Sequence, residues 1–418
     1  MQDFANKNGL YAVLDIGTSG TRCLIAKVGE NGEPTIAGHG IALSKGVKNM
    51  TIVNLADAGK SIGKAMDDAE GEAEAGIEKI LCNAVVEQTQ SVIVNVKIPL
   101  KTGAVTQADL SAVRDAALEK IDFKDKQALH CFPVEYVLDD KAFHGDDFEP
   151  EGLNGDTFGM AVHAILCEKN PLRTLHKAIA QAHLDCAGTV SSPYAAGLAC
   201  LTPDEAERGC CVVDLGAGST GIAVFKGSQL IYETSLPVNS SHITNDIAAW
   251  LHVSKKDAEI IKCKYGAAQA SDAFDLQEID YKPFGDEYMI SHTRKELCDA
   301  VIRPRVEEIF RYVAKALKKS GFDKACGDFV LTGGGSQLQS ILNVAAKELS
   351  PNVRLGVPLN VHDPKRFVEK AAYPLFTGCF GLLRYIFKER MYATSHKSDN
   401  TVKRNSVSKI FHWFLENC

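Results

Sequence analysis

Two glycine-rich turns carry the residue types that bind a phosphate group and a hydrated cation. In VVDLGAGSTGIAVF, residues 212–225, an apolar run reaches Asp214, turns at the glycines and returns as a second apolar run. Glycine lets backbone N–H groups approach a phosphate, hydroxyl side chains add donors, and a carboxylate at the strand end can hold a hydrated cation. The candidate phosphate contacts are Gly216, Ala217, Gly218, Ser219 and Thr220.

The residues after this turn exclude two common nucleotide-binding motifs. A dinucleotide-binding fold or a Walker loop needs a helix directly after its glycines, whereas Ile222 to Phe225 continues as a strand. Taken alone, the turn is equally consistent with an ordinary glycine hairpin.

The first half of the chain repeats the pattern. VLDIGTSGTRCLIAKV, residues 13–28, aligns with it without gaps, and Asp15 falls on Asp214. The candidate contacts here are Gly17, Thr18, Ser19 and Thr21. Two such hairpins predict a duplicated α/β domain of the βββαβα type, with two lobes that face each other across one phosphate.

A third glycine loop follows a short predicted strand at Phe329 to Leu331. Gly333, Gly334 and Gly335 lead into a helix that we expect from Gln337 to Leu349. A helix N-terminus offers backbone N–H groups and the positive end of a dipole, which suits a nucleotide.

The surrounding segments must position these loops. We expect residues 1–83 to form the core of the first lobe, 84–167 a βαββ insert, 168–200 the return of the first lobe with a connecting helix, and 201–387 the second lobe, which returns to the first near 375–387. The predicted insert has strands at 91–98, 129–139 and 158–167 and a helix over 106–120 with a capping box. The second lobe carries predicted helices at 243–252, 254–265 and 293–319, the last kinked near Pro304.

Composition excludes several classes of protein. The chain has 418 residues, of which 45% are hydrophobic and 24% charged, as in a soluble protein of two to four domains. A net charge of -7 argues against nucleic acid as a partner. The 13 cysteines lack CxxC spacing, which favours free thiols over disulfides or zinc. Met1 to Leu10 has no hydrophobic signal region and no apolar stretch is long enough to span a membrane, so we expect a cytoplasmic location.

The three loops together resemble those of the actin, sugar-kinase and chaperone ATPase superfamily. LDIGTSGT is similar to its first phosphate loop, VDLGAGST to its second, and LTGGGSQL to its adenosine loop. Within the superfamily the chain resembles the FtsA family of bacterial cell-division proteins over nearly its whole length. The stretches that carry this resemblance are HCFPVEYVLD at 130–139, GLNGDTFGMAVHAI at 152–165, ITNDIA at 243–248, AEIIKCKYG at 258–266 and VIRPRVEEIF at 301–310.

The resemblance implies ATP and Mg²⁺ in a cleft between the lobes, with Asp15 and Asp214 near the metal and the hairpins on the phosphates. Around adenosine it implies Glu259, Lys262, Gly333, Gly334, Gly335 and Gln337. The family pattern also implies that the insert joins neighbouring subunits of a filament and that the second lobe binds the C-terminal peptide of the tubulin-like protein FtsZ. Our candidates for that contact are Arg294, Arg303 and Arg305, against the alternative of a solvated start of a helix.

Five residues at three sites depart from the patterns of related ATPases. Ser19 and Gly20 replace a Ser-Lys pair, so a lysine contact to phosphate is not expected, and Ser240 and Ser241 stand where the family has glycine. Chaperone relatives place a glutamate before the proline of the connecting helix, whereas this chain has Ser192. Because serine is a poor base near neutral pH, we expect at most slow ATP hydrolysis. A small-molecule kinase and a scaffold similar to pilus-assembly ATPases remain the alternatives.

The C-terminal segment predicts contact with a membrane surface. Residues 388–405 form a polar predicted linker, and residues 406–418 form a predicted amphipathic helix. Its apolar side is made of Val407, Ile410, Phe411, Trp413, Phe414 and Leu415. One such helix binds lipid weakly and reversibly, and docking on the protein body is the alternative. With the resemblance, the segment implies a filament-forming tether between FtsZ and the inner membrane at the septum, which recruits later division proteins.

Overall fold

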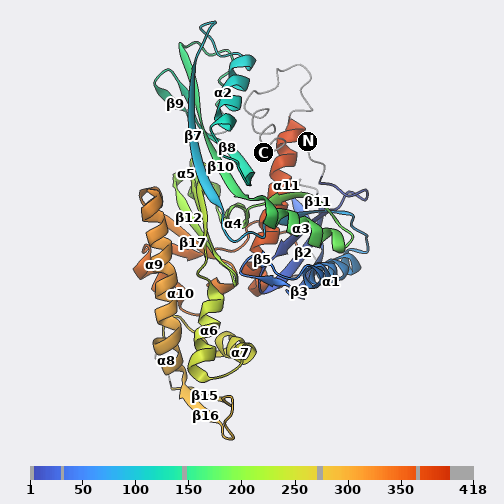
Figure 1. Cartoon of the computed structure of the whole chain (residues 1–418), viewed down its shortest axis with the longest axis vertical. Coiled ribbons are helices and arrows are strands. Elements are labelled where there is room, and N and C mark those ends of the chain that lie inside the picture. Colours follow the sequence, from blue (N-terminus) through green and yellow to red (C-terminus); the bar gives the residue numbers. More distant parts are fainter. Residues whose placement is uncertain (1–3, 30–32, 144–147, 271–275, 364–367, 396–418) are drawn as a thin grey trace.

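The computed structural model describes residues 4–29, 33–143, 148–270, 276–363 and 368–395. Two five-stranded sheets lie in two lobes, and a four-stranded sheet forms an insert beyond them (Figure 1). The strand orders are β11-β6-β1-β2-β3 in the first lobe and β14-β13-β12-β17-β18 in the second. Each lobe thus has an antiparallel three-stranded meander followed by two parallel strands, which confirms the duplicated α/β fold predicted from the repeated hairpins.

The first lobe packs helices against its sheet. Its strands are β1 (Tyr11–Ile16), β2 (Gly20–Val28), β3 (Pro34–Leu43), β6 (Lys79–Asn83) and β11 (Asp185–Val190), with a small pair β4 (Val47–Lys48) and β5 (Thr51–Ile52). Helices α1 (Leu55–Ala73) and α3 (Lys169–Gln181) contact each other. The side chain of Asn54 caps α1 by accepting a hydrogen bond from Asp57 N, as its N-cap type favours. Ile62, Ala65 and Ala69 of α1 are fully buried in one cluster with β1 and β2.

The insert stands between β6 and α3 in the chain. It consists of β7 (Gln90–Pro99), α2 (Gln107–Glu119), β8 (Lys126–Leu138), β9 (Lys141–Phe143) and β10 (Thr157–Glu168), in the sheet order β7-β10-β8-β9. Thr106 and Asp109 form the predicted capping box of α2. Apart from the short β9, these are the strands and the helix that the sequence predicts, and they have a hydrophobic cluster of their own around Leu110 and Phe158.

The second lobe is longer because helices and a hairpin extend below its sheet in Figure 1. Its strands are β12 (Cys210–Leu215), β13 (Thr220–Lys226), β14 (Gln229–Leu236), β17 (Asp328–Thr332) and β18 (Val353–Leu355), with a separate hairpin β15 (Glu278–Tyr281) and β16 (Ile290–Thr293). Its helices are α6 (Ser240–Leu251), α7 (Lys255–Tyr265), α8 (Arg294–Leu297), the π-helical η1 (Cys298–Ile302), α9 (Arg303–Ser320) and α10 (Ile341–Glu348), with 3₁₀ turns η2 (Asp323–Ala325) and η3 (Gly334–Gln337).

Two helices connect the lobes at the centre of the molecule. Helix α4 (Ser192–Cys200) leads to the short α5 (Pro203–Arg208), and α11 (Thr377–Ser395) follows the 3₁₀ segment η4 (Lys370–Phe376). Helices α4 and α11 cross closely, because a methyl group on Gly381 would overlap the backbone of Ala195. The return of the chain to the first lobe is visible where α11 contacts β1 and β2.

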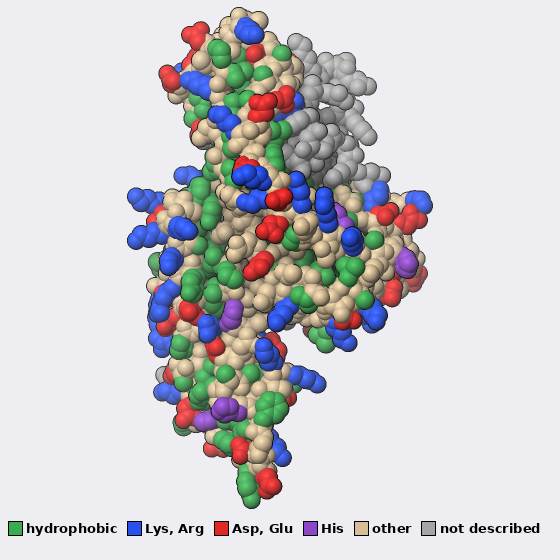
Figure 2. All heavy atoms as spheres, viewed as in Figure 1, with side chains coloured by type: hydrophobic (Ala, Val, Ile, Leu, Met, Phe, Trp, Pro, Cys, Tyr) green, Lys and Arg blue, Asp and Glu red, His purple; other side chains and the backbone are tan. Residues whose placement is uncertain are grey.

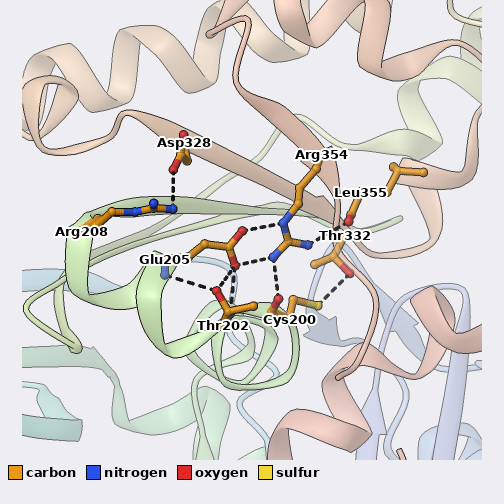
Figure 3. A network of polar contacts seen from close by, with 8 residues as sticks. All are labelled: Cys200, Thr202, Glu205, Arg208, Asp328, Thr332, Arg354 and Leu355. Carbon is orange, nitrogen blue, oxygen red and sulfur yellow. Dashed lines mark hydrogen bonds and ion pairs between the residues drawn. The ribbon is translucent and has the colours of Figure 1, made fainter. Parts of the chain in front are cut away.

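A polar network connects α4 and α5 to strand β18 of the second lobe (Figure 3). The guanidinium of Arg354, on β18, donates to both carboxylate oxygens of Glu205 at 2.6 Å and to the carbonyl oxygen of Cys200 at 2.9 Å. Glu205 also accepts from the N–H of Thr202, and the Arg354 guanidinium lowers the pKa of Glu205 to about 2. The connecting helices are thereby held to the edge strand of the second sheet.

Three predicted boundaries differ from the structure. The segment after the third glycine loop is first the turn η3, and α10 begins only at Ile341, because Ser340 adopts a left-handed conformation with φ of 60°. The predicted helix over 293–319 is divided by the π-helical η1, which ends directly before Arg303 and Pro304. Helix α11 continues to Ser395, within the segment that the sequence predicts as a linker.

Candidate functional site

The two predicted phosphate loops face each other across the lobes. Thr18, in the first loop, accepts a hydrogen bond from Met50 N at 3.2 Å, and a methyl group on Gly218 of the second loop would overlap the Thr18 hydroxyl. The turn at Gly17 is closed by its N–H bond to Gly20 O, and the turn at Gly216 by the matching bond to Ser219 O. The structure therefore brings the repeated motifs into the opposed arrangement that their duplication predicts.

Both predicted metal-binding carboxylates lie at this junction, and the charge of Asp15 affects Asp214. Burial raises the pKa of Asp15, and it raises the pKa of Asp214 to about 7 with a further contribution from the charge of Asp15. Arg22 lies opposite Asp15 in the register of β1 and β2, and its charge lowers the pKa of both carboxyls. Arg22 was not among the predicted residues, although the hairpin pattern in the sequence already places it opposite Asp15.

Two glycines outside the phosphate loops pack on these carboxylates. A methyl group on Gly378, at the start of α11, would lie 2.6 Å from Asp15 Oδ2, and one on Gly333 would overlap Asp214 Oδ1. Gly333 also has a φ of 80°, which a side chain rarely adopts. The third glycine loop is thus next to the second phosphate loop, and Gly378 is a residue for which no local sequence signal existed.

The start of α6 orients the peptide planes of the second phosphate loop. Asn239 Nδ2 donates to Gly218 O at 2.9 Å, Ser240 Oγ donates to Gly216 O at 2.9 Å, and Ser241 Oγ donates to Ala217 O at 2.6 Å. In a trans peptide the following N–H points opposite to the carbonyl. The N–H groups of Ala217, Gly218 and Ser219 therefore point away from α6. The serines that replace glycine hold the loop in place.

The hydroxyls of Thr21 and Thr220 are bonded within their own lobes. The hydroxyl of Thr220 donates to Val238 O at 2.7 Å, and that of Thr21 lies 3.1 Å from Ser44 Oγ. Both side chains are fully buried. Thr21 and Thr220 stand at the start of the two return strands, where alternation turns the side chain into the protein. Ser19 and Ser219 remain at least partly exposed.

Glu259 and Lys262 form a polar cluster between α7 and α6. Lys262 Nζ donates to Glu259 Oε2 at 2.8 Å and to Thr244 Oγ1 at 3.0 Å, and Thr244 also donates to Glu259. The lysine side chain is only 14% exposed. The Glu259 side chain is 50% exposed, so the ion pair is only partly buried. Thr244, one turn after Ser240, belongs to the cluster and was not among the predicted residues.

The third glycine loop joins this cluster to the phosphate loops. A methyl group on Gly335 would lie 2.9 Å from Leu215 O and 3.0 Å from Ser240 Cβ, so the loop packs on the second phosphate hairpin and on α6. Ala268 N donates to Gln339 O, which links the end of α7 to the same loop. Gly334 and Gln337 are exposed in the turn η3. All the residues predicted around adenosine are therefore in one region of the second lobe.

A small, partly open cavity of about 20 Å³ lies beside Asp214 between the lobes, lined also by Ser192, Pro193, Ser219 and Met50. This volume accommodates about one water molecule. Asn83 donates to Ser192 Oγ at 3.2 Å and accepts from Ile16 N at 2.7 Å. Ser192, which precedes Pro193 at the start of α4, is thus held next to the first phosphate loop.

A groove of about 680 Å³ lies between α6, η1 and α9 of the second lobe. Its lining includes the indole of Trp250, the aliphatic Val301 and Pro304, the bases Arg305 and Arg311, and the acids Asp246 and Glu308. Arg305 donates to both carboxylate oxygens of Asp246 at 2.5 and 3.0 Å. Lys and Arg side chains are also numerous along the left edge of Figure 2, where α9 runs.

The three arginines predicted to contact FtsZ do not share one surface. Arg305 lines the groove, and Arg303, on the same helix, is paired with Glu307 at 2.9 Å. Arg294 is only 7% exposed, and its guanidinium donates to Tyr265 O at 2.8 Å and to the side chain of Gln339. The guanidinium of Arg294 is thus bonded inside the second lobe, at the end of α7, and its contact with FtsZ stays a prediction.

The predicted membrane-binding residues, from Val407 to Leu415, lie outside the described residues. Within the described part of the chain, no helix combines the length and the apolar character required to cross a membrane.

Two family models and a set of curated relatives match this chain. A family model described as "Cell division protein FtsA" matches residues 211–377, and one described as "SHS2 domain inserted in FTSA" matches residues 87–166, which lie in the insert. Cell division protein FtsA of Rhizobium meliloti (strain 1021) is 32% identical over 395 residues, which cover 91% of this chain and 88% of the relative.

Solved structures share the fold at low sequence identity. The PilM-PilN type IV pilus biogenesis complex matches with a TM-score of 0.64 and 18% identity, covering 92% of this chain and 98% of that one. MreB 5 of Spiroplasma citri bound to AMPPNP matches with a TM-score of 0.53 and 11% identity, covering 94% and 100%. The fold is that of actin-like ATPases, and the sequence similarity to curated relatives assigns the chain within it. The chain belongs to the FtsA family of cell division proteins.

Proposed function

We propose that the chain binds ATP with Mg²⁺ between its two lobes, assembles into filaments, and tethers FtsZ to the cytoplasmic face of the inner membrane at the division septum. There it also recruits later division proteins. Family membership supports the role in division. The site supports nucleotide binding, and the C-terminal segment supports membrane binding.

The observation that carries nucleotide binding is the opposition of the two phosphate loops, with three N–H groups of the second loop oriented away from α6. Backbone N–H groups arranged in this way form an anion-binding concavity. Arg22 supplies a positive charge beside the first loop, where the lysine found in relatives is absent. The nucleotide-bound MreB 5 structure has the same fold, which is compatible with this assignment.

Asp15 and Asp214 fit a site for Mg²⁺. This ion is commonly held by one or two carboxylates together with substrate phosphates and water, rather than by a cage of protein ligands. The described residues contain no group of three or more His, Cys, Asp or Glu that could hold a metal by itself, so the phosphates must complete the site. A bound cation would also favour the ionised form of Asp214, whose pKa burial raises to about 7.

ATP turnover should be slow. The cavity beside Asp214 has room for a water molecule, but Ser192, which Asn83 holds there, is too weak a base to activate it. We therefore assign the nucleotide a role in closing the lobes and favouring assembly. ATP hydrolysis is a minor activity at most.

We propose that the FtsZ C-terminal peptide binds in the groove between α6 and α9. Trp250, Val301 and Pro304 offer apolar surface, while Arg305 and Arg311 offer charge to acidic side chains. Because Arg305 is already paired with Asp246, an acidic peptide must compete with an internal carboxylate, which favours moderate affinity.

The C-terminal segment supports weak membrane binding that assembly strengthens. A single short amphipathic helix binds reversibly, but several tails on one filament make the later contacts intramolecular and raise the overall avidity. If ATP favours filament assembly, it also strengthens binding to the membrane.

The test is co-sedimentation with liposomes that contain anionic lipid. The full chain and a chain that ends at Asn405 are compared with and without ATP and Mg²⁺. We expect only the full chain to pellet, and more of it with ATP. If both chains stay soluble under all conditions, the proposal that this chain binds the membrane is wrong. If both pellet equally, the C-terminal segment is not the anchor.

A further inference from the structure

Two cysteine thiols meet between the parallel strands β6 and β11 of the first lobe. The Sγ atoms of Cys82 and Cys186 are 3.6 Å apart, which is van der Waals contact for sulfur. In the register of the strands, Cys186 pairs with Ile80, and an irregularity follows between Cys186 and Gly188. The thiol contact thus results from a local departure from regular strand pairing.

The two thiols have different surroundings. Cys82 is fully buried, whereas Cys186 is partly exposed. The hydrogen bond from Cys82 lowers the pKa of Cys186, burial raises it, and His176 from α3 lowers it again, so that the net pKa lies below the usual range. The hydrogen bond with Cys186 and burial hold the pKa of Cys82 well above its usual range. Cys186 is therefore the more nucleophilic thiol at neutral pH, and Cys82 is its neighbour.

We propose that Cys82 and Cys186 form a dithiol site that reduces a small peroxide and closes a disulfide between β6 and β11. The Cys186 thiolate attacks one peroxide oxygen, the O–O bond breaks, and the released hydroxide takes a proton to become water. Cys186 is then a sulfenic acid. The sulfur of Cys82 attacks the sulfenic sulfur, the S–O bond breaks, and the Cys82 proton leaves with the hydroxide as a second water. Two thiols lose two electrons in total, and hydrogen peroxide is reduced to two waters.

The position of the pair explains why its chemistry would matter to the protein. Asn83, directly after Cys82, accepts a hydrogen bond from Ile16 N and donates to Ser192. Ile16 precedes the first phosphate loop. The dithiol is therefore on the strand that supports this loop, while remaining outside the nucleotide site itself.

Peptide mapping of the full chain tests the proposal. The reduced protein is treated with one equivalent of hydrogen peroxide, the remaining thiols are blocked with iodoacetamide, and the chain is digested with trypsin without reduction. Cys82 lies in the tryptic peptide 80–97, and Cys186 lies with Cys200 in the peptide 178–208. We expect these two peptides to be linked, with fragment ions that place the bond at Cys186. Recovery of both peptides unlinked, or a bond at Cys200, would overturn the proposal.

Single variants separate the two steps. In Cys82→Ser we expect the sulfenic acid of Cys186 to persist and to be trapped by dimedone, whereas Cys186→Ser should leave Cys82 unmodified. The control is Cys263, which is exposed but whose pKa is raised by burial and by Glu259. Cys186 should react with peroxide about tenfold faster than Cys263 at pH 7. Faster reaction of Cys263 would contradict the role of Cys186. If a variant does not fold, the peptide map of the unmodified chain decides.

Discussion

Ser191, the N-cap residue of α4 in the first lobe, donates a hydrogen bond to the carboxylate of Glu233 on strand β14 of the second lobe. The same carboxylate accepts from Thr89 at 3.2 Å, and Glu233 N donates to Ser91 Oγ at 3.0 Å, both at the start of the insert. Glu233 is fully buried. One side chain thus connects the two lobes and the insert.

A histidine of the insert extends this network. His163 Nδ1 lies 2.8 Å from Leu230 O of β14, and its Nε2 contacts the hydroxyl of Ser91. Burial lowers the pKa of His163 to about 4, so the ring is neutral near pH 7 and donates one hydrogen bond through Nδ1. The orientation of the insert relative to the second lobe therefore depends on buried hydrogen bonds.

The first prediction concerns Glu233 and pH. Burial raises its pKa from 4.5 to about 7, which means that the folded chain retains this proton to a higher pH than the unfolded chain. The contribution of protonated Glu233 to the free energy of unfolding is complete below pH 4.5 and is lost as the pH rises through 7. In Glu233→Gln this loss disappears. We expect the free energy of unfolding of the original chain to fall relative to the variant by up to about 3 kcal/mol between pH 4.5 and pH 8, measured by urea unfolding.

Glu205→Gln is the control with the opposite sign. The Arg354 guanidinium lowers the pKa of Glu205 to about 2, so its contribution is present above pH 4.5 and is lost as the pH falls towards 2. The difference in the free energy of unfolding between Glu205→Gln and the original chain should be constant from pH 5 to pH 8. Parallel stability curves for the original chain and Glu233→Gln over this range would contradict the assignment.

The second prediction concerns Lys262 and nucleotide affinity. Its ammonium group bridges α6 and α7 next to the third glycine loop, so Lys262→Ala should weaken binding of a fluorescent ATP analogue with Mg²⁺ by about tenfold, or about 1.4 kcal/mol. The matched control is Lys264→Ala on the same helix, whose ammonium group lies over the ring of Tyr265. That variant should bind within about twofold of the original chain. Equal losses in both variants would mean that the cluster does not contact the nucleotide.

The third prediction concerns the groove of the second lobe. Arg305→Ala should weaken binding of a synthetic FtsZ C-terminal peptide by about tenfold or more, because the guanidinium in the groove is lost and the carboxylate of Asp246 then repels acidic residues. Arg303→Ala, on the same helix but outside the lining of the groove, should change affinity by less than about threefold. Fluorescence anisotropy measures both. Unchanged affinity in Arg305→Ala would exclude this groove.

The fourth prediction concerns the crossing of α4 and α11. A methyl group on Gly381 overlaps the backbone of Ala195, which cannot move as a flexible side chain could, so Gly381→Ala should destabilise the chain by about 1–3 kcal/mol. Gly71→Ala is the control, because Gly71 is in α1 with open space around it. That change should be neutral or stabilise by up to about 1 kcal/mol through helix propensity. Thermal unfolding compares the two, and equal effects would contradict a close crossing.

The positions of the phosphate loops were readable from sequence, because a strand, a glycine turn and a returning strand are formed by residues adjacent in the chain. Asp15 and Asp214 stand at the ends of β1 and β12 for this local reason. The repeat then predicted two lobes, which the matching strand orders confirm. The capping box at Thr106 was also local, as was the N-cap at Asn54. Asn239 had the same kind of signal before α6, and attention to N-caps could have found it.

The contacts that complete the site come from segments far apart in the chain. Nothing near Gly378 indicates that α11 returns to pack on Asp15, and nothing near Arg294 indicates that its guanidinium is used inside the second lobe. Likewise, Cys82 and Cys186 are ordinary cysteines in sequence and become a pair only through the irregular pairing of β6 and β11. Hairpins and caps follow from short-range hydrogen bonding and periodicity, which the sequence contains. The direction in which a side chain points at a crossing of helices or lobes depends on the packing of the whole molecule, and only the tertiary structure decided it.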